Sequence, residues 1–132
     1  MLLRELNIGS SLYKYGDISI DINRKCKPII VSDAHHLPFR KGTFLRVISH
    51  HILEHITSPL KALIEISYVL KKGGGAEIIV YYSLYEAFHK KLGKDHYSLF
   101  AHINLFTKES LLSLCKKANL KVVGIYRQSL HG

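Results

Sequence analysis

Two runs of three consecutive apolar residues constrain the fold of this chain more than any other feature of its sequence. They are Ile29-Ile30-Val31 and Ile78-Ile79-Val80. Each run is typical of a short strand, and its continuous apolar character is expected of a strand that is covered on both faces. Strands of this kind occur in parallel sheets with helices packed against them. The two runs therefore predict an α/β fold.

The segment between the two runs carries the signals of a helix. Ser58 is a natural N-cap residue, and Pro59 suits the first helical position because the N–H that proline lacks has no helical partner there. An apolar stripe at helical spacing follows, and Lys71 and Lys72 favour the negative end of the helix dipole. The glycines at 73–75 predict the end of this helix.

Shorter patterns predict the other elements. Thr107 is the expected N-cap of a second helix. Because strands alternate with helices, we expect right-handed crossovers and a mostly parallel sheet with helices on both faces. The length of 132 residues predicts one domain over residues 1–132. The expected strands are Leu6–Ile8, Ile18–Ile22, Pro28–Ser32, Phe44–Ser49, Gly75–Tyr82 and Leu120–Tyr126.

Charge and composition narrow the partners and the compartment. The chain has 19 Lys and Arg against 10 Asp and Glu, a formal net charge of +9. Such an excess attracts nucleic acid and other anionic partners, although scattered lysine pairs equally serve solubility. No apolar run is long enough to span a membrane, and the first residues lack the apolar core of a signal peptide. With Cys26 and Cys115 outside any CxxC motif, we expect a cytoplasmic protein that does not bind membranes.

Residues that follow the predicted strands are candidates for a site, because ligands of open α/β sheets bind outside the carboxyl ends of the strands. Gly9 follows the first strand and allows close approach to the backbone, although a plain turn explains it equally well. Asp21 ends the second strand, where a carboxylate can accept both hydroxyls of a ribose; a turn-forming aspartate is the alternative. Asp33 follows the third strand and could accept a hydrogen bond from the exocyclic amine of a nucleobase.

The block from Asp33 to Gly74 reads DAHHLPFRKGTFLRVISHHILEHITSPLKALIEISYVLKKGG. It resembles the central block of class I S-adenosylmethionine-dependent methyltransferases, and it is similar to the small type 11 branch of that family. The segments His102–Thr107 and Ala118–Leu120 resemble the tail of the same family. The resemblance implies a compact, single Rossmann-like methyltransferase domain with S-adenosyl-L-methionine as its cofactor. It leaves the methyl acceptor open.

The resemblance also implies roles for residues at the nucleoside end of the cofactor. Asp21 would bind the ribose hydroxyls, and Ile22 would pack on the adenine. Asp33 would accept a hydrogen bond from the adenine amino group, and Ala34 would donate its backbone N–H to the ring.

At the sulfonium end, the resemblance places Gly9 and Ser10 under the methionine part of the cofactor. Ser49 and His50 would close over the sulfonium, near the place where the acceptor arrives. The first loop departs from the family pattern, because it reads Gly9-Ser10-Ser11-Leu12-Tyr13 where the family usually has GxGxG.

Histidines near this site are candidate general bases. Methyl transfer from a sulfonium needs a base only when the acceptor carries a proton, and a group that titrates near neutrality suits that task. His51 and His50 are the candidate catalytic residues, and His96 and His102 lie in a later loop. Each of them could instead be a hydrogen-bonded structural residue or a cofactor contact.

Two other functions fit parts of the same sequence. The residues from His51 to His55 match H-x-x-E-H, in which two histidines four apart on one helical face bind zinc, but spacing marks out no third ligand. Together with the flanking resemblance, this leads us to expect no metal. The second alternative is an inactive methyltransferase fold that binds nucleic acid through its basic surface. Because little chain is left to build an acceptor pocket, we also expect a second copy to complete it in a homodimer.

Overall fold

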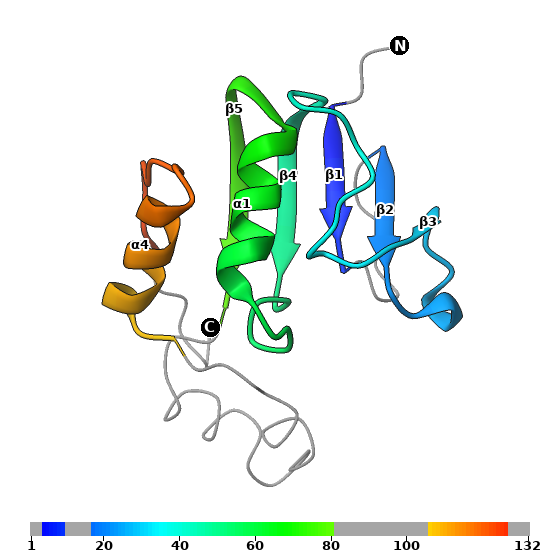
Figure 1. Cartoon of the computed structure of the whole chain (residues 1–132), viewed down its shortest axis with the longest axis horizontal. Helices are drawn as coiled ribbons and strands as arrows, with labels where there is room; N and C mark the ends of the chain where they lie inside the picture. Colours follow the sequence, from blue (N-terminus) through cyan, green and yellow to red (C-terminus); the bar gives the residue numbers. More distant parts are fainter. Residues whose placement is uncertain (1–3, 10–16, 81–105, 127–132) are drawn as a thin grey trace, which may run out of the picture.

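The computed structural model describes residues 4–9, 17–80 and 106–126. They form a five-stranded sheet with helices packed on it (Figure 1). The strands are β1 (Glu5–Ile8), β2 (Ile18–Asp21), β3 (Ile30–Val31), β4 (Phe44–His50) and β5 (Leu70–Ile79). The helices are the short 3-10 helix η1 (Arg24–Cys26), α1 (Pro59–Val69) and α4 (Lys108–Lys117).

The strand order is β3-β2-β1-β4-β5, and every pair of neighbouring strands in this order is parallel. Helix α1 is the crossover between β4 and β5 and lies across one face of these two strands (Figure 1). Because the strands are parallel, their carboxyl ends meet at one edge of the sheet, the lower edge in Figure 1. The mostly parallel α/β sheet that the sequence predicts is confirmed.

The apolar core lies between the sheet and α1. Leu6, Ile20 and Val47 come from three adjacent strands and share one face, and each is fully buried. Leu63 and Ile66 of α1 are buried against them at 0% and 1% exposure. Each such side chain contributes roughly 1.5–3 kcal/mol of transfer free energy. The core therefore holds α1 on the sheet and fixes where its first turn lies.

The first turn of α1 forms as the sequence predicts. The Ser58 hydroxyl accepts a hydrogen bond from the backbone N–H of Lys61 at 3.2 Å, and Pro59 is the first helical residue. Farther along, Lys61 Nζ lies 3.5 Å from a carboxylate oxygen of Glu65, one turn later. Local side-chain chemistry thus marks the residue at which this helix begins.

The end of α1 differs from the prediction. The helix ends at Val69, and β5 begins at Leu70, because Leu70 pairs with Phe44 of β4. Lys71 and Lys72 therefore lie in a strand and not in the last helical turn. Pairing with a strand residue 26 positions earlier overrides the glycine signal that predicts a longer helix.

The run at 29–31 is not covered on both faces, so this part of the prediction is wrong. β3 has only two residues, Ile30 and Val31, and it forms the edge of the described sheet beside β2. Ile29 and Val31 are 63% and 47% exposed. An edge position explains the exposure, because β3 has a neighbouring described strand on one side only.

For the C-terminal segment, residues 106–126, one prediction is confirmed and one is wrong. Thr107 caps α4 as predicted: its hydroxyl accepts from the backbone N–H of Ser110 at 3.1 Å, and the Ser110 hydroxyl accepts from the backbone N–H of Thr107 at 2.9 Å. The segment Leu120–Tyr126, by contrast, is not a strand in the described residues. Val123 and Tyr126 are 92% and 94% exposed.

Candidate functional site

Two backbone hydrogen bonds continue the sheet past the ends of its strands and bring the candidate residues into one row. The N–H of Gly9 donates to the carbonyl of Ile20 at 2.9 Å, and the N–H of Ser32 donates to the carbonyl of Asp21 at 3.1 Å. The ends of β1, β2 and β3 are thereby fixed to one another. A ligand at this edge would meet Gly9, Asp21 and the residues after Ser32 side by side.

Asp21 begins a turn that leads into η1. Its Oδ1 accepts from the backbone N–H of Asn23 at 2.9 Å, and Asn23 in turn caps η1 by accepting from the N–H of Lys25 at 3.0 Å. The side chain of the intervening Ile22 is 70% exposed. The turn-forming role of Asp21 is therefore confirmed, and its ligand-binding role stays a prediction.

Asp33 is fixed by the residue two positions later. Its Oδ1 accepts from the backbone N–H of His35 at 2.9 Å and from the ring Nδ1 of His35 at 2.8 Å. The hydrogen bond from the backbone N–H of His35 is the main cause that holds the pKa of Asp33 below its ordinary value of 3.8. Among the described residues, none donates to the second oxygen, Oδ2, and the side chain is 43% exposed. Asp33 therefore keeps an acceptor directed away from its own turn, and Ala34 lies half-buried beside it.

His35 is a residue that sequence reasoning did not assign. Its Nε2 accepts from the backbone N–H of Ser58, the N-cap of α1, at 3.1 Å, and its side chain is 15% exposed. The spacing Asp-x-His gives a weak signal for the bond to Asp33. The partner on α1 is 23 residues away, and only the fold brings it close.

Gly9 lies at the end of β1 with a φ of +66°, a conformation that favours glycine. A Cβ at this position would collide with the side chain of Ile52. The glycine thus permits a close approach, as the sequence predicts, but in this structure the approaching group is Ile52. Ser10, the other residue that the resemblance assigns to the methionine part, lies outside the described residues.

Ser49 is buried near the end of β4, at 1% exposure, and it pairs in register with Ile8 of β1. Its hydroxyl has no hydrogen-bond partner among the described residues. A buried hydroxyl without a partner is costly and points to a group that completes the site.

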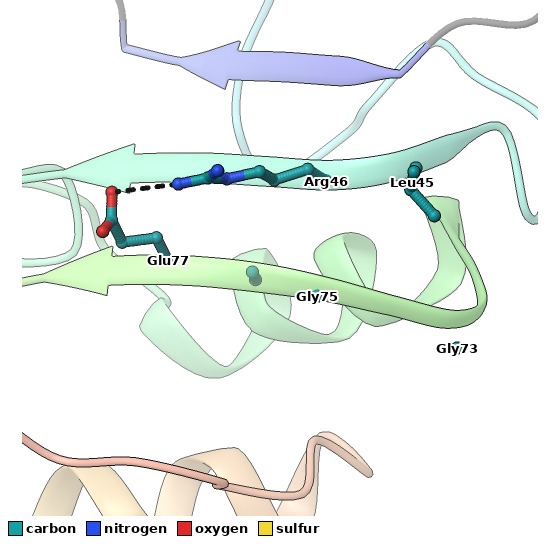
Figure 2. Close-up of a pocket in the computed structure, with 6 residues that line it drawn as sticks. Leu45, Arg46, Gly73, Gly75 and Glu77 are labelled. Carbon is teal, nitrogen blue, oxygen red and sulfur yellow. Dashed lines mark ion pairs between the residues drawn. The ribbon is translucent and has the colours of Figure 1, made fainter.

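His50 follows Ser49 and is part of a charged cluster between β4 and β5. Its Nε2 lies 2.8 Å from Oε2 of Glu77, and the guanidinium of Arg46 lies 3.8 Å from the same oxygen. Figure 2 shows Arg46 and Glu77 reaching toward each other across these strands, beside an open cavity of about 370 Å³. Because the carboxylate accepts from Nε2, the Nδ1 atom of His50 keeps a lone pair that can bind a proton.

His51 is also paired with a carboxylate. Its Nδ1 lies 3.2 Å from Oε2 of Glu54, which is fully buried, and its backbone N–H donates to the carbonyl of Ile79 at 2.7 Å. The φ of His51 is +57°, a left-handed conformation that is uncommon for residues other than glycine but that histidine adopts more often than most. The backbone bond and the carboxylate hold the ring in place at the end of β4.

The helical zinc motif that the sequence offered as an alternative is not formed. Residues 51–58 contain turns and bends but no helix, because His51 adopts a left-handed conformation and His55 closes a turn with the carbonyl of Ile52 at 3.0 Å. The two histidines therefore do not share a helical face. Within residues 4–9, 17–80 and 106–126, no group of three or more histidine, cysteine or acidic side chains could hold a metal ion. His96 and His102, the later candidates, lie outside the described residues.

The residues at this edge fit the nucleoside part of S-adenosylmethionine. Asp21 and Asp33 provide carboxylate acceptors at two neighbouring strand ends. Ile22, which follows Asp21 in the sequence, provides an exposed apolar side chain. The unpartnered hydroxyl of Ser49 fits a further polar group of a ligand. Beside Gly9, the side chain of Ile52 must move before a ligand can approach the backbone.

Comparisons with known proteins identify the family of this chain. A family model described as a methyltransferase domain matches residues 8–125. Among curated proteins, none matches this chain significantly. None of the helices in the described part of the chain has the length and apolar character of a membrane span.

Solved structures of methyltransferases have the same fold. An S-adenosylmethionine-dependent methyltransferase from Thermotoga maritima has a TM-score of 0.69 at 22% identity, with 88% of this chain and 63% of that chain covered. One from Archaeoglobus fulgidus has a TM-score of 0.68 at 18% identity, with 88% and 60% covered. Phosphoethanolamine N-methyltransferase 2 from Haemonchus contortus, solved with S-adenosyl-L-methionine, has a TM-score of 0.62 at 23% identity, with 88% and 32% covered.

The chain spans less than two-thirds of the length of each of these structures. S-adenosylmethionine is the cofactor of the group that they represent. Because the family model covers all but 14 of the 132 residues, the chain belongs to the methyltransferase domain family, within the class I methyltransferase superfamily.

Proposed function

We propose that this chain binds S-adenosylmethionine at the carboxyl ends of β1 to β4 and takes part in the transfer of its methyl group to an acceptor. The observation that carries the proposal is the family match over residues 8–125. The parallel sheet with acidic residues at the ends of β2 and after β3 supports it, because ligands of such sheets bind at these ends.

The nucleoside would be held by the acidic half of the site. Asp21 binds the ribose hydroxyls, Asp33 accepts from the adenine amino group through Oδ2, and Ala34 donates its backbone N–H to the ring. Ile22 covers the adenine, which fits its exposure of 70%. Each hydrogen bond to a carboxylate contributes on the order of 1.5–3 kcal/mol.

The methionine part and the sulfonium would lie toward β1 and β4. Gly9 and Ser10 lie under the methionine, and Ser49 and His50 close over the sulfur. The unpartnered hydroxyl of Ser49 supports this placement, because a ligand in this position satisfies it. Ile52 swings away from Gly9 when the ligand enters.

The bound cofactor supplies an activated methyl group, so the chain itself has to orient the reactants and accept a proton where the acceptor carries one. His51 and His50 are the proposed bases. Each has one ring nitrogen beside a carboxylate, Glu54 or Glu77, and the carboxylate stabilises the imidazolium that forms when the other nitrogen takes the proton.

The wider assignment follows the same resemblance. We place the chain in the type 11 branch, with an anionic acceptor that the net charge of +9 attracts. Cys115 is a buried free cysteine, which fits a reducing cytoplasm. Burial also raises the pKa of its thiol. A second copy completes the acceptor pocket, so light scattering should show a dimer; full activity from a strict monomer would exclude this arrangement.

Calorimetric titration tests the proposal directly. The purified chain is titrated with S-adenosylmethionine and with S-adenosylhomocysteine, and separately with duplex DNA and RNA at several salt concentrations. Saturable heat with the two adenosyl compounds is the expected result. If neither compound binds at millimolar concentration while nucleic acid binds in a strongly salt-dependent manner, the chain is a scaffold and the proposed activity is wrong.

A further inference from the structure

His35 connects the acidic residue after β3 to the first turn of α1. Asp33 Oδ1 accepts from both the backbone N–H and the ring Nδ1 of His35, at 2.9 and 2.8 Å. On the other side of the ring, Nε2 lies 3.1 Å from the backbone nitrogen of Ser58 and 3.4 Å from the hydroxyl oxygen of Thr57. The ring therefore has hydrogen-bond partners at both of its nitrogens.

The chemistry of the two partners fixes the protonation of the ring. An ionised carboxylate can only accept, so Nδ1 must carry the proton that is shared with Asp33. A backbone N–H can only donate, so Nε2 must carry the lone pair that accepts from Ser58. His35 is consequently a neutral imidazole with its proton on Nδ1, and any other form breaks one of the two bonds.

A second contact joins the same loop to the same helix. The backbone N–H of Leu37 donates to Oε1 of Glu65 at 2.8 Å, and Leu37 itself is buried. The loop after β3 is thus attached to α1 at its cap and again farther along the helix. The contact through His35 also includes the Asp33 carboxylate, which is bonded through Oδ1. The other oxygen, Oδ2, can accept a hydrogen bond from a ligand.

We propose that His35 is a positioning residue that orients the Asp33 carboxylate toward the adenine amino group of the cofactor and fixes this carboxylate to the first turn of α1. This proposal rests on the proposed function, because it concerns the same nucleoside site. Its consequence is a specific one: His35 contributes to the preference for an adenine over a base that has an oxygen in place of the amino group.

Two substitutions each remove one of the two hydrogen bonds of the His35 ring and keep the other. His35→Asn keeps a donor near the position of Nδ1 and loses the acceptor for Ser58, whereas His35→Gln keeps an acceptor near the position of Nε2 and loses the ring donor to Asp33. The matched control is His36→Gln, because His36 is the exposed neighbour and, among the described residues, its ring forms no hydrogen bond to Asp33 or Ser58 and acts on Asp33 through its charge alone.

The measurement is the ratio of the dissociation constants of S-inosylhomocysteine and S-adenosylhomocysteine, which differ in the 6-amino group. In the wild-type chain and in His36→Gln we expect a preference of about tenfold or more for the adenosyl compound. His35→Asn should keep most of this preference, and His35→Gln should reduce it to about threefold or less. A change in fold stability alone would weaken both ligands equally and leave the ratio unchanged.

A second measurement needs no ligand. Nitrogen-15 chemical shifts of the wild-type imidazole should show a neutral ring with the proton on Nδ1 of His35. A proton on Nε2, or an unchanged ligand preference in His35→Gln, overturns the proposal while the proposed function stands. If the wild-type chain binds neither adenosyl nor inosyl compound, the proposed function fails, and this inference fails with it.

Discussion

The two halves of the strand-end edge use their carboxylates in different ways. At β2 and β3, Asp21 and Asp33 accept from backbone N–H groups and stay partly exposed. Asp33 also accepts from the ring of His35, whose other nitrogen is bound to the backbone N–H of Ser58. At β4 and β5, Glu77 and Glu54 are hydrogen-bonded to histidine rings. A carboxylate held by fixed donors is an acceptor that a ligand can use, whereas a histidine beside a carboxylate can gain and lose a proton. In the proposed function, the first half binds the nucleoside and the second half accepts the proton.

The largest expected effect is at His51, where a loss of methyl transfer can be distinguished from a loss of cofactor binding. His51→Asn tolerates the left-handed backbone, keeps a donor for Glu54 and removes the second ring nitrogen. If His51 is the base, transfer of labelled methyl groups from S-adenosylmethionine into a cell extract should fall about 10²–10⁴-fold, with cofactor affinity unchanged.

His50→Gln is the matched variant for that experiment, because a glutamine can keep the bond to Glu77 without a titratable ring. It should retain turnover if His51 is the base. A loss in His50→Gln with retained turnover in His51→Asn would reverse the two assignments, and retention in both would show that no base is required.

The next effect concerns the binding half. Asp21→Ala should weaken the affinity for S-adenosylmethionine by about tenfold or more, because the ribose loses its carboxylate partner. Asp17→Ala is the control, since Asp17 also binds backbone N–H groups, those of Arg4 and Glu5, but does so before β2 begins. Calorimetry should show unchanged affinity for the control. An equal loss in both variants would mean that Asp21 acts only through the stability of the fold.

A smaller effect of opposite sign is expected at Ile52. The side chain of Ile52 occupies the space beside Gly9. Ile52→Ala should raise the affinity for S-adenosylhomocysteine by about threefold, because the ligand no longer has to bind a minor conformation in which this side chain has moved away. Ile64→Ala, at an exposed position of α1, should leave the affinity unchanged. A weaker affinity in Ile52→Ala would show that Ile52 contacts the ligand and does not exclude it.

The smallest expected effect is the acid response of Asp33. Its pKa is lowered in the folded chain, so its ionised form stabilises the fold above the unfolded value of 3.8, and this stabilisation is lost as the pH falls below 3.8. Because the side chain is 43% exposed, the contribution should not exceed the roughly 0–1 kcal/mol of exposed ion pairs. Thermal unfolding of wild type and Asp33→Asn should differ at pH 6 and converge near pH 2; a constant difference contradicts the assignment.

Local chemistry made part of this structure predictable. Ser58 and Pro59 predict the start of α1, and Thr107 predicts the start of α4, because a cap depends on side chains within three or four residues. The parallel sheet followed from the alternation of strands and helices. The resemblance of the central block led to the family, which the match over residues 8–125 shows.

What the sequence could not predict depends on distant partners. The end of α1 is decided by the pairing of Leu70 with Phe44, and the exposure of Ile29 by the edge position of β3. In the same way, the connection from His35 to Ser58 exists only because the loop after β3 packs beside the cap of α1. The site residues themselves remain predictions, to be tested by the variants above.

The segment from Lys121 to Tyr126 has a practical consequence for anyone who handles this protein. It is a short β-prone stretch with one charge and no proline, and it displays Val123 and Tyr126 almost entirely to water. Sequences of this type associate edge to edge into insoluble aggregates. A glutamate in place of Val123 would act as a gatekeeper there, and it should keep concentrated samples in solution without changing any residue of the proposed site.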